Sequence, residues 1–185
     1  MRFNKHHLLV IVMIIVTLVS CKKIDVEGYR VYKIKEGHHR SNTAYCTTKS
    51  NYLSFNAIFD ESAQYTSSDP INQSDVNKLY GLSDCGTSHK NNSIRFGWRW
   101  LNDSLEILWF KHEDGDFSFG NMTTIDFNVS YQYSITFTED SYILIVDGVE
   151  VEVDRKCSET YRKYYLYPYF GGDEKAPHNI TVRIK

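Results

Sequence analysis

The segment YILIVDGVEVEVD, Tyr142–Asp154, decides the fold class of this chain. Its first half is an apolar run, and its second half alternates valine with acidic residues. Asp147-Gly148 between the halves supplies the positive φ angles of a tight two-residue turn. Because successive side chains of a strand point to opposite faces, the valines share one face and the acidic residues the other. The segment therefore predicts an antiparallel β-hairpin whose second strand has one side in water.

The same strand-like pattern recurs along the rest of the chain. Tyr, Phe and Trp make up 15% of the residues, a composition typical of strands. A second hairpin turn is predicted at Leu101–Ser104, and one short helix at Ser74–Tyr80, where Ser74 can cap the first turn and Gly81 can end the last. We predict an all-β, two-sheet antiparallel sandwich with strands at Tyr29–Lys35, Tyr52–Phe59, Ser93–Trp100, Leu105–His112, Tyr131–Thr138, Tyr142–Asp147, Val149–Asp154, Tyr164–Phe170 and Asn179–Ile184.

The N-terminus has the pattern of an export signal. Arg2 and Lys5 precede the apolar run LLVIVMIIVTLVS, Leu8–Ser20. As a helix this run would measure about 20 Å, which is short of the ~30 Å hydrocarbon core of a bilayer. The run therefore predicts a signal peptide and not a membrane span.

The residues that follow are more specific. Leu18-Val19-Ser20-Cys21 resembles the lipobox of bacterial lipoproteins, and this implies lipidation of Cys21 and firm anchoring by its acyl chains. In such lipoproteins an aspartate directly after the cysteine commonly retains the protein at the inner membrane. This chain has Lys22 at that position, so the resemblance implies the outer membrane. The protein would lie on the cell surface or on the periplasmic face of that membrane. We expect a signal peptide at 1–20, a lipidated tether at 21–28 and one β-sandwich domain at 29–185. The alternative is an ordinary secretory signal with Cys21 in a disulfide.

The net charge of the chain excludes one class of binding partner. The formal net charge is −2 at pH 7, so nucleic acid is not expected to bind.

Cys46, Cys85 and Cys157 remain in the domain, and the sequence does not decide which two of them form a disulfide. The acidic turns at 112–116 and 172–174 are of a kind that can hold calcium, but Asp-Gly turns form without metal. No metal and no cofactor are therefore expected.

Larger stretches resemble known families. YILIVDGVEVEV and the ending APHNITVRI are similar to segments of concanavalin-like and laminin-G-like jelly rolls. NKLYGLSDCG (77–86), RFGWRW (95–100) and LYPYFGGDEKAPHNITVRI (166–184) together resemble a family of small, functionally uncharacterised surface lipoproteins of Gram-negative bacteria. The resemblance implies a jelly-roll fold and brings no activity with it.

The tyrosine-rich strand near the C-terminus is expected to expose one row of rings. In YYLYPYF, 164–170, alternation predicts Tyr164, Leu166, Pro168 and Phe170 on the core face and Tyr165, Tyr167 and Tyr169 on the more exposed face. Pro168 cannot donate to a ladder, so this strand is expected to lie at an edge or to bend there.

Arginines are expected on the exposed side of a second strand. In SIRFGWRW, 93–100, arginines alternate with apolar residues. Aromatic rings stack on pyranose faces, and arginine supplies a planar fork of donors for hydroxyls and carboxylates. The alternative is structural, with arginine stems covering half-buried tyrosines. The predicted carbohydrate-binding residues are Arg95, Arg99, His112, Tyr165, Tyr167 and Tyr169.

These features favour a lipid-anchored surface protein with a non-catalytic glycan-binding or accessory role. One alternative is a protein-interaction or adhesin-type subunit, for which the tyrosines would form the contact surface. A further alternative is a polysaccharide lyase, because Tyr169-Phe170-Gly171-Gly172 partly resembles the Y-F-K-A-G strand of alginate lyases. Gly171 replaces the lysine of that motif, however, and the R-x-E-x-R and Q-x-H motifs of those enzymes are absent. The E-x-D-x-x-E strand of jelly-roll glycoside hydrolases is absent as well.

Overall fold

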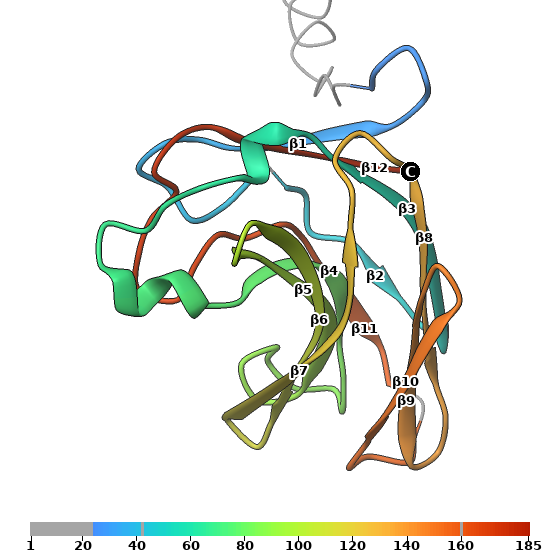
Figure 1. Cartoon of the computed structure of the whole chain (residues 1–185). Coiled ribbons are helices and arrows are strands. Elements are labelled where there is room, and N and C mark those ends of the chain that lie inside the picture. Colours follow the sequence, from blue (N-terminus) through green and yellow to red (C-terminus); the bar gives the residue numbers. More distant parts are fainter. Residues whose placement is uncertain (1–23, 42, 160) are drawn as a thin grey trace, which may run out of the picture.

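The structure is a computed structural model that describes residues 24–41, 43–159 and 161–185. These residues form two antiparallel six-stranded sheets packed against each other, as Figure 1 shows, so the predicted all-β sandwich is confirmed. The predicted signal peptide and Cys21 lie outside the described residues. The helices within these ranges are two short 3-10 segments, η2 at Glu61–Ala63 and η3 at Pro70–Ser74. In this part of the chain no helix has the length and apolar character that a membrane crossing requires.

The first sheet contains the hairpin at 142–154. Asp147 and Gly148 have φ angles of 48° and 84°, and Val146 pairs with Val149 across the turn. The predicted hairpin and its two-residue turn are therefore confirmed. In the order of the sheet, the strands are β1 (Arg30–Ile34), β12 (Ile180–Ile184), β3 (Tyr52–Phe59), β8 (Tyr131–Phe137), β9 (Ser141–Val146) and β10 (Val149–Asp154).

The second sheet lies inside the curve of the first in Figure 1. Its central hairpin turns through Asn102 and Asp103, both with positive φ, as the predicted turn at Leu101–Ser104 requires. In the order of the sheet, the strands are β2 (Thr47–Thr48), β11 (Lys163–Leu166), β4 (Asn77–Ser83), β5 (Ser93–Leu101), β6 (Ser104–Glu113) and β7 (Asp116–Ile125).

Aromatic rings fill the space between the sheets. Phe55 of β3 stacks on Tyr133 of β8 with centroids 5.0 Å apart, and both rings meet Phe96 of β5 edge to face. Trp98 is fully buried and contacts the ring of Phe59 across the sandwich. Burial of such large apolar side chains is the main stabilising term of a sandwich, at about 1.5–3 kcal/mol for each fully buried ring.

The predicted helix at Ser74–Tyr80 is wrong. η3 begins at Pro70, where the Asp69 side chain accepts the backbone N–H of Ile71, and it ends at Ser74. Asn77–Ser83 is strand β4, paired with β5 on one side and β11 on the other. Leu79 and Leu82 of β4 are fully buried. Burial of these leucines and two ladders of backbone hydrogen bonds outweigh a local capping signal.

Strand β7 was missed because the apolar side chains at its start do not face the core. Phe117 and Phe119 alternate with polar residues, as in a strand, but both rings are exposed. The acidic turn before β7 is the tip of the β6–β7 hairpin, where Asp114 and Gly115 have φ angles of 51° and 96°. Backbone geometry therefore accounts for the acidic Asp-Gly sequence at this tip.

A disulfide and a buried ion pair join the two sheets at one end. Cys85, just after β4, is bonded to Cys157, just after β10. This pairing was left open by the sequence, and Cys46 remains as an exposed thiol. Beside the disulfide, Asp84 accepts a hydrogen bond of 2.7 Å from Nε of Arg155, and both side chains are almost fully buried. This end of the sandwich is therefore held by covalent and ionic contacts.

Candidate functional site

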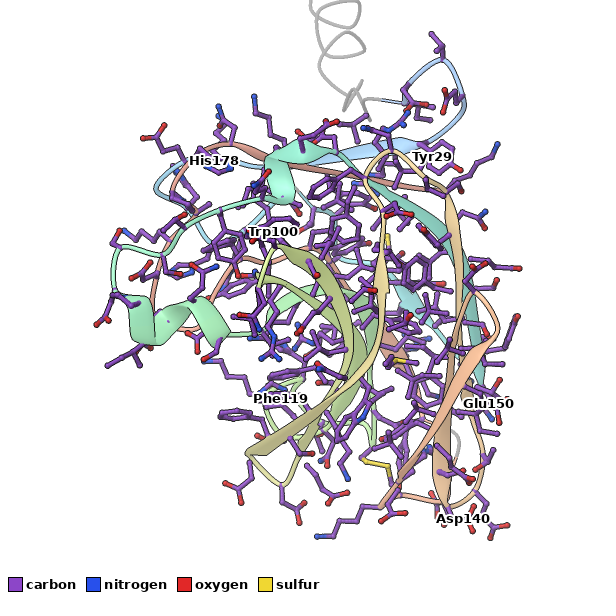
Figure 2. All side chains as sticks on the ribbon, viewed as in Figure 1. Tyr29, Trp100, Phe119, Asp140, Glu150 and His178 are labelled. Carbon is purple, nitrogen blue, oxygen red and sulfur yellow. A yellow bond between two sulfur atoms is a disulfide. The ribbon has the colours of Figure 1, made fainter. Side chains whose placement is uncertain are left out.

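The second sheet has an outer face, turned away from the core, that carries aromatic and cationic side chains. On β5, Ile94 and Phe96 belong to the core, so Arg95 between them points outward. Phe110 of β6 belongs to a small separate cluster outside the main core. Figure 2 shows Phe119 of β7 on this outer side, across the molecule from the first sheet. The candidate site is built on this face.

Three phenylalanine rings stack at one end of the outer face. The ring of Phe110 is nearly parallel to those of Phe117 and Phe119, with centroids 5.7 and 6.3 Å away. Phe117 is 63% exposed and Phe119 43%, which is uncommon for side chains of this size. Together with Lys78 and His112, they line a hollow of about 410 Å³, here named the phenylalanine hollow. A flat apolar ligand surface can therefore stack on these rings.

A second hollow of about 420 Å³, here named the tyrosine hollow, lies along β11 and the segment after it. The hydroxyl of Tyr164 accepts a 2.6 Å hydrogen bond from the backbone N–H of His89 and contacts Nδ1 of the same residue at 2.9 Å. The ring of Tyr169 stacks on His39 at 5.2 Å. No Asp or Glu is among the described residues that line this hollow. Its polar groups are therefore donors and neutral acceptors.

Arg95 lines one hollow and approaches a ring of the other. Its guanidinium lines the tyrosine hollow, and Cζ is 5.9 Å from the ring centroid of Phe110, which lines the phenylalanine hollow. Nζ of Lys78 is 4.4 Å from the same centroid. We name the two hollows, with Arg95, Lys78 and His112, the cationic groove.

Burial lowers the pKa values of two basic side chains in the groove, Lys78 and His112. Burial, and then the charge of Arg95, lower the pKa of Lys78 to about 8. Burial lowers the pKa of His112 to about 4, and the charges of Arg95 and Lys78 add to this effect. Loss of solvation penalises a charged imidazole, so His112 is neutral at pH 7 and can donate one hydrogen bond and accept another.

The predicted faces of the tyrosine-rich segment hold for Tyr169 and Phe170 but are inverted for the residues before Pro168. Tyr165 and Tyr167 pack against the core, where their rings contact Tyr80. Leu166 is absent from the core cluster and lines the tyrosine hollow instead. Strand β11 ends at Leu166, so strict alternation does not extend through the proline that follows. Tyr165 and Tyr167 still line the tyrosine hollow, as Tyr169 does, so all three predicted tyrosines contribute to the groove.

The two predicted arginines have different environments. Arg95 lines the groove, whereas Nε of Arg99 donates a 2.6 Å hydrogen bond to Glu106. The guanidinium of Arg99 also donates to the carbonyl of Ser74 and to Asn121. Arg99 is therefore engaged in contacts within the protein. His112 lines the phenylalanine hollow, so the structure brings it together with Arg95 but not with Arg99.

Several groove residues were not predicted. Lys78 lies in the segment that was predicted to be a helix. Phe117 and Phe119 lie on β7, which was not predicted as a strand. Tyr164 was placed on the core face. The alternation D-F-S-F in 116–119 is the signal that could have identified the exposed phenylalanines.

Solved structures of other proteins resemble this architecture. The alginate lyase AlyC3 superposes with a TM-score of 0.64 at 14% sequence identity, over 92% of this chain and 78% of that one. The laminarinase catalytic domain from Thermotoga petrophila gives a TM-score of 0.55 at 14% identity, over 85% and 75% of the two chains. A Bacteroides ovatus mixed linkage glucan GH16 protein gives 0.56 at 7% identity, over 88% and 81%. The fold is a concanavalin-like jelly roll.

This fold confirms the resemblance noted in the hairpin and in the C-terminal strand. No protein-family model matches the chain, and no curated protein sequence does either. At such low identities the likeness establishes the jelly roll alone. What the groove binds must therefore be argued from its own residues.

Proposed function

We propose that this chain is a lipid-anchored surface protein that binds a polysaccharide in the cationic groove without cleaving it. The observation that carries the proposal is the combination of exposed stacking rings, at Phe117 and Phe119, with two cations, Arg95 and Lys78, that form no ion pair within the described residues. The solved proteins that share the jelly roll are named for action on alginate and on β-glucans, which supports a carbohydrate ligand.

The chemistry of the groove suits a sugar chain. Pyranose rings present C–H faces that stack on phenyl rings, and their hydroxyls need fixed donors and acceptors. The groove supplies these through the Tyr164 hydroxyl, the neutral His112 imidazole and the Arg95 guanidinium. Because Arg95 of the tyrosine hollow lies 5.9 Å from the ring of Phe110 in the phenylalanine hollow, a ligand longer than one sugar can reach both.

A second candidate, polysaccharide lyase activity, has one observation in its favour. Arg95 and Tyr169 line the same hollow, and His112 lies close enough for the charge of Arg95 to lower its pKa. A cation, a neutral base and a phenol are the groups that an elimination beside a uronate carboxylate needs. Gly171 and the missing motifs speak against this function, so the experiment below must detect product as well as binding.

The proposed function is tested by titrating the protein with polysaccharides in a calorimeter. The panel contains a polyglucuronate, a sulfated dextran and a neutral β-1,3-glucan. We expect saturable binding of at least one polymer and no new reducing ends or unsaturated product after prolonged incubation. Turnover of a polymer would establish an enzyme instead. Absence of binding to the whole panel would contradict the proposal and favour a protein partner.

The membrane anchor is a separate part of the proposal. Cys21 follows a signal-like run and stands in the lipobox-like sequence LVSC. We expect Cys21→Ser to abolish lipidation, since the thiol is the acyl acceptor, and to move the protein out of the detergent phase on phase separation. Unchanged partitioning of the Cys21→Ser protein would contradict the lipoprotein assignment.

A further inference from the structure

Arg95 is a buried cation without a partner. Its side chain is almost covered, at 6% residue exposure, and Nε has no hydrogen-bond partner. No salt bridge in the described part of the chain includes Arg95 either. Water is excluded from Nε, and no hydrogen-bond acceptor of the described residues replaces it; the group that approaches the guanidinium is the ring of Phe110. An arrangement of this kind costs stability, because a charge loses its hydration without compensation.

The other buried cations of the described residues are all compensated. Lys111 contacts the Glu113 carboxylate, and Arg155 is paired with Asp84. Lys163 donates a 2.8 Å hydrogen bond to the side-chain oxygen of Asn51. The lack of a partner is therefore particular to Arg95 and not a general property of buried cations in this fold.

A second cation approaches the same place. Nζ of Lys78 donates hydrogen bonds only to backbone carbonyls, those of Val76 and Gly171, and lies over the ring of Phe110 as Arg95 does. Asp75 and Asp173 also line the phenylalanine hollow, but neither forms an ion pair with Lys78 or Arg95. Two positive charges thus converge beside one phenyl ring, and the Asp75 carboxylate acts on Lys78 without forming an ion pair with it.

The geometry points to an anion-binding centre at Arg95 and Lys78 that holds a carboxylate or sulfate group of an acidic polysaccharide. This inference rests on the proposed function and specifies the class of glycan. The guanidinium offers paired N–H donors in a plane, which suits carboxylate and sulfate oxygens, and the ammonium adds a point charge. Sugar rings next to the anionic one reach the exposed rings of Phe117 and Phe119.

The unpaired charge of Arg95 allows a test that distinguishes a role in ligand binding from a role in stabilising the fold. Arg95→Met keeps an unbranched apolar stem and removes the uncompensated charge. We expect the melting temperature to rise by a few degrees, because the desolvation cost disappears. We expect affinity for the acidic polymer to fall about tenfold or more, because charge-assisted hydrogen bonds are lost. If Arg95 served the fold alone, the substitution would lower the melting temperature and leave affinity unchanged.

Arg183→Met is the matched control. Arg183 lies on β12 of the other sheet, where it is paired with Asp25 and Glu27, and its replacement changes the net charge by the same amount. We expect this variant to keep the affinity of the wild type. An equal loss in both variants would show that the polymer responds to overall charge and would overturn the inference.

The polymer panel separates the two levels of the proposal. The inference predicts at least tenfold tighter binding of polyglucuronate or sulfated dextran than of the neutral glucan, and the preferred polymer identifies the anionic group. Equal binding of the neutral glucan, retained in Arg95→Met, would overturn the anion-binding centre and leave polysaccharide binding intact. Failure of every polymer to bind would overturn both.

Discussion

Asp84→Ala is expected to lower the free energy of unfolding by about 3–5 kcal/mol. Asp84 is fully buried and accepts hydrogen bonds from Nε of Arg155 and from the hydroxyl of Tyr142. Removing the carboxylate leaves the guanidinium buried without its counter-charge, and breaking a buried pair on one side costs this amount. Urea unfolding, monitored by tryptophan fluorescence, measures the loss as a lower midpoint at unchanged slope.

An exposed ion pair serves as the control for this prediction. Glu27 is paired with Arg183 at 3.1 Å, and its side chain is 58% exposed. Glu27→Ala is expected to cost less than about 1 kcal/mol, because solvent screens such pairs. The double variant Asp84→Leu/Arg155→Met should recover much of the lost stability, since it leaves no unpaired charge. Comparable small losses for Asp84→Ala and Glu27→Ala would contradict the structural role of the buried pair.

Removing the disulfide is expected to have an effect of similar size. Cys85 and Cys157 are 72 residues apart in sequence, and closing a loop of this length restricts the unfolded chain by about 4 kcal/mol. Cys85→Ala/Cys157→Ala should therefore unfold at clearly lower urea concentration than the wild type.

Cys46→Ala is the control, because that thiol is exposed and unpaired. Cys46→Ala should unfold at the same urea concentration as the wild type. If Cys85→Ala/Cys157→Ala lowered the free energy of unfolding by less than about 1 kcal/mol, the stabilising role of the disulfide would be contradicted. Since Asp84 and Cys85 are adjacent, the effects of removing the ion pair and the disulfide are not expected to add.

The fold was largely predictable because its signals are local. The turns at Asp147-Gly148 and Leu101–Ser104 specify their own backbone angles, and β3 and β10 have the bounds that were predicted. The missed strand β7 shows where this reasoning fails. Phe117 and Phe119 of β7 line the groove and are exposed. The alternation of apolar and polar residues at the start of this strand therefore does not indicate a face buried in the core.

The groove was only partly predictable, because it depends on contacts between distant segments. Arg95 and His112 were identified from residue type and alternation. The lack of a carboxylate near Arg95 becomes visible only when β4, β6 and β11 surround it. Tyr165 and Tyr167 were placed on the wrong face because the bend at Pro168 interrupts the alternation on which that assignment relied. Residue pattern indicates which side chains are suitable, and packing decides which of them meet.

Hydroxyl-radical footprinting with polyglucuronate tests the central claim most directly, because it locates the ligand on the protein surface. The account predicts that oxidation of Phe117 and Phe119 falls when the polymer is saturating, while oxidation of Tyr52, exposed on the first sheet, stays the same. Protection of Tyr52 with unchanged oxidation of both phenylalanines would place the ligand elsewhere and contradict the cationic groove as the binding site.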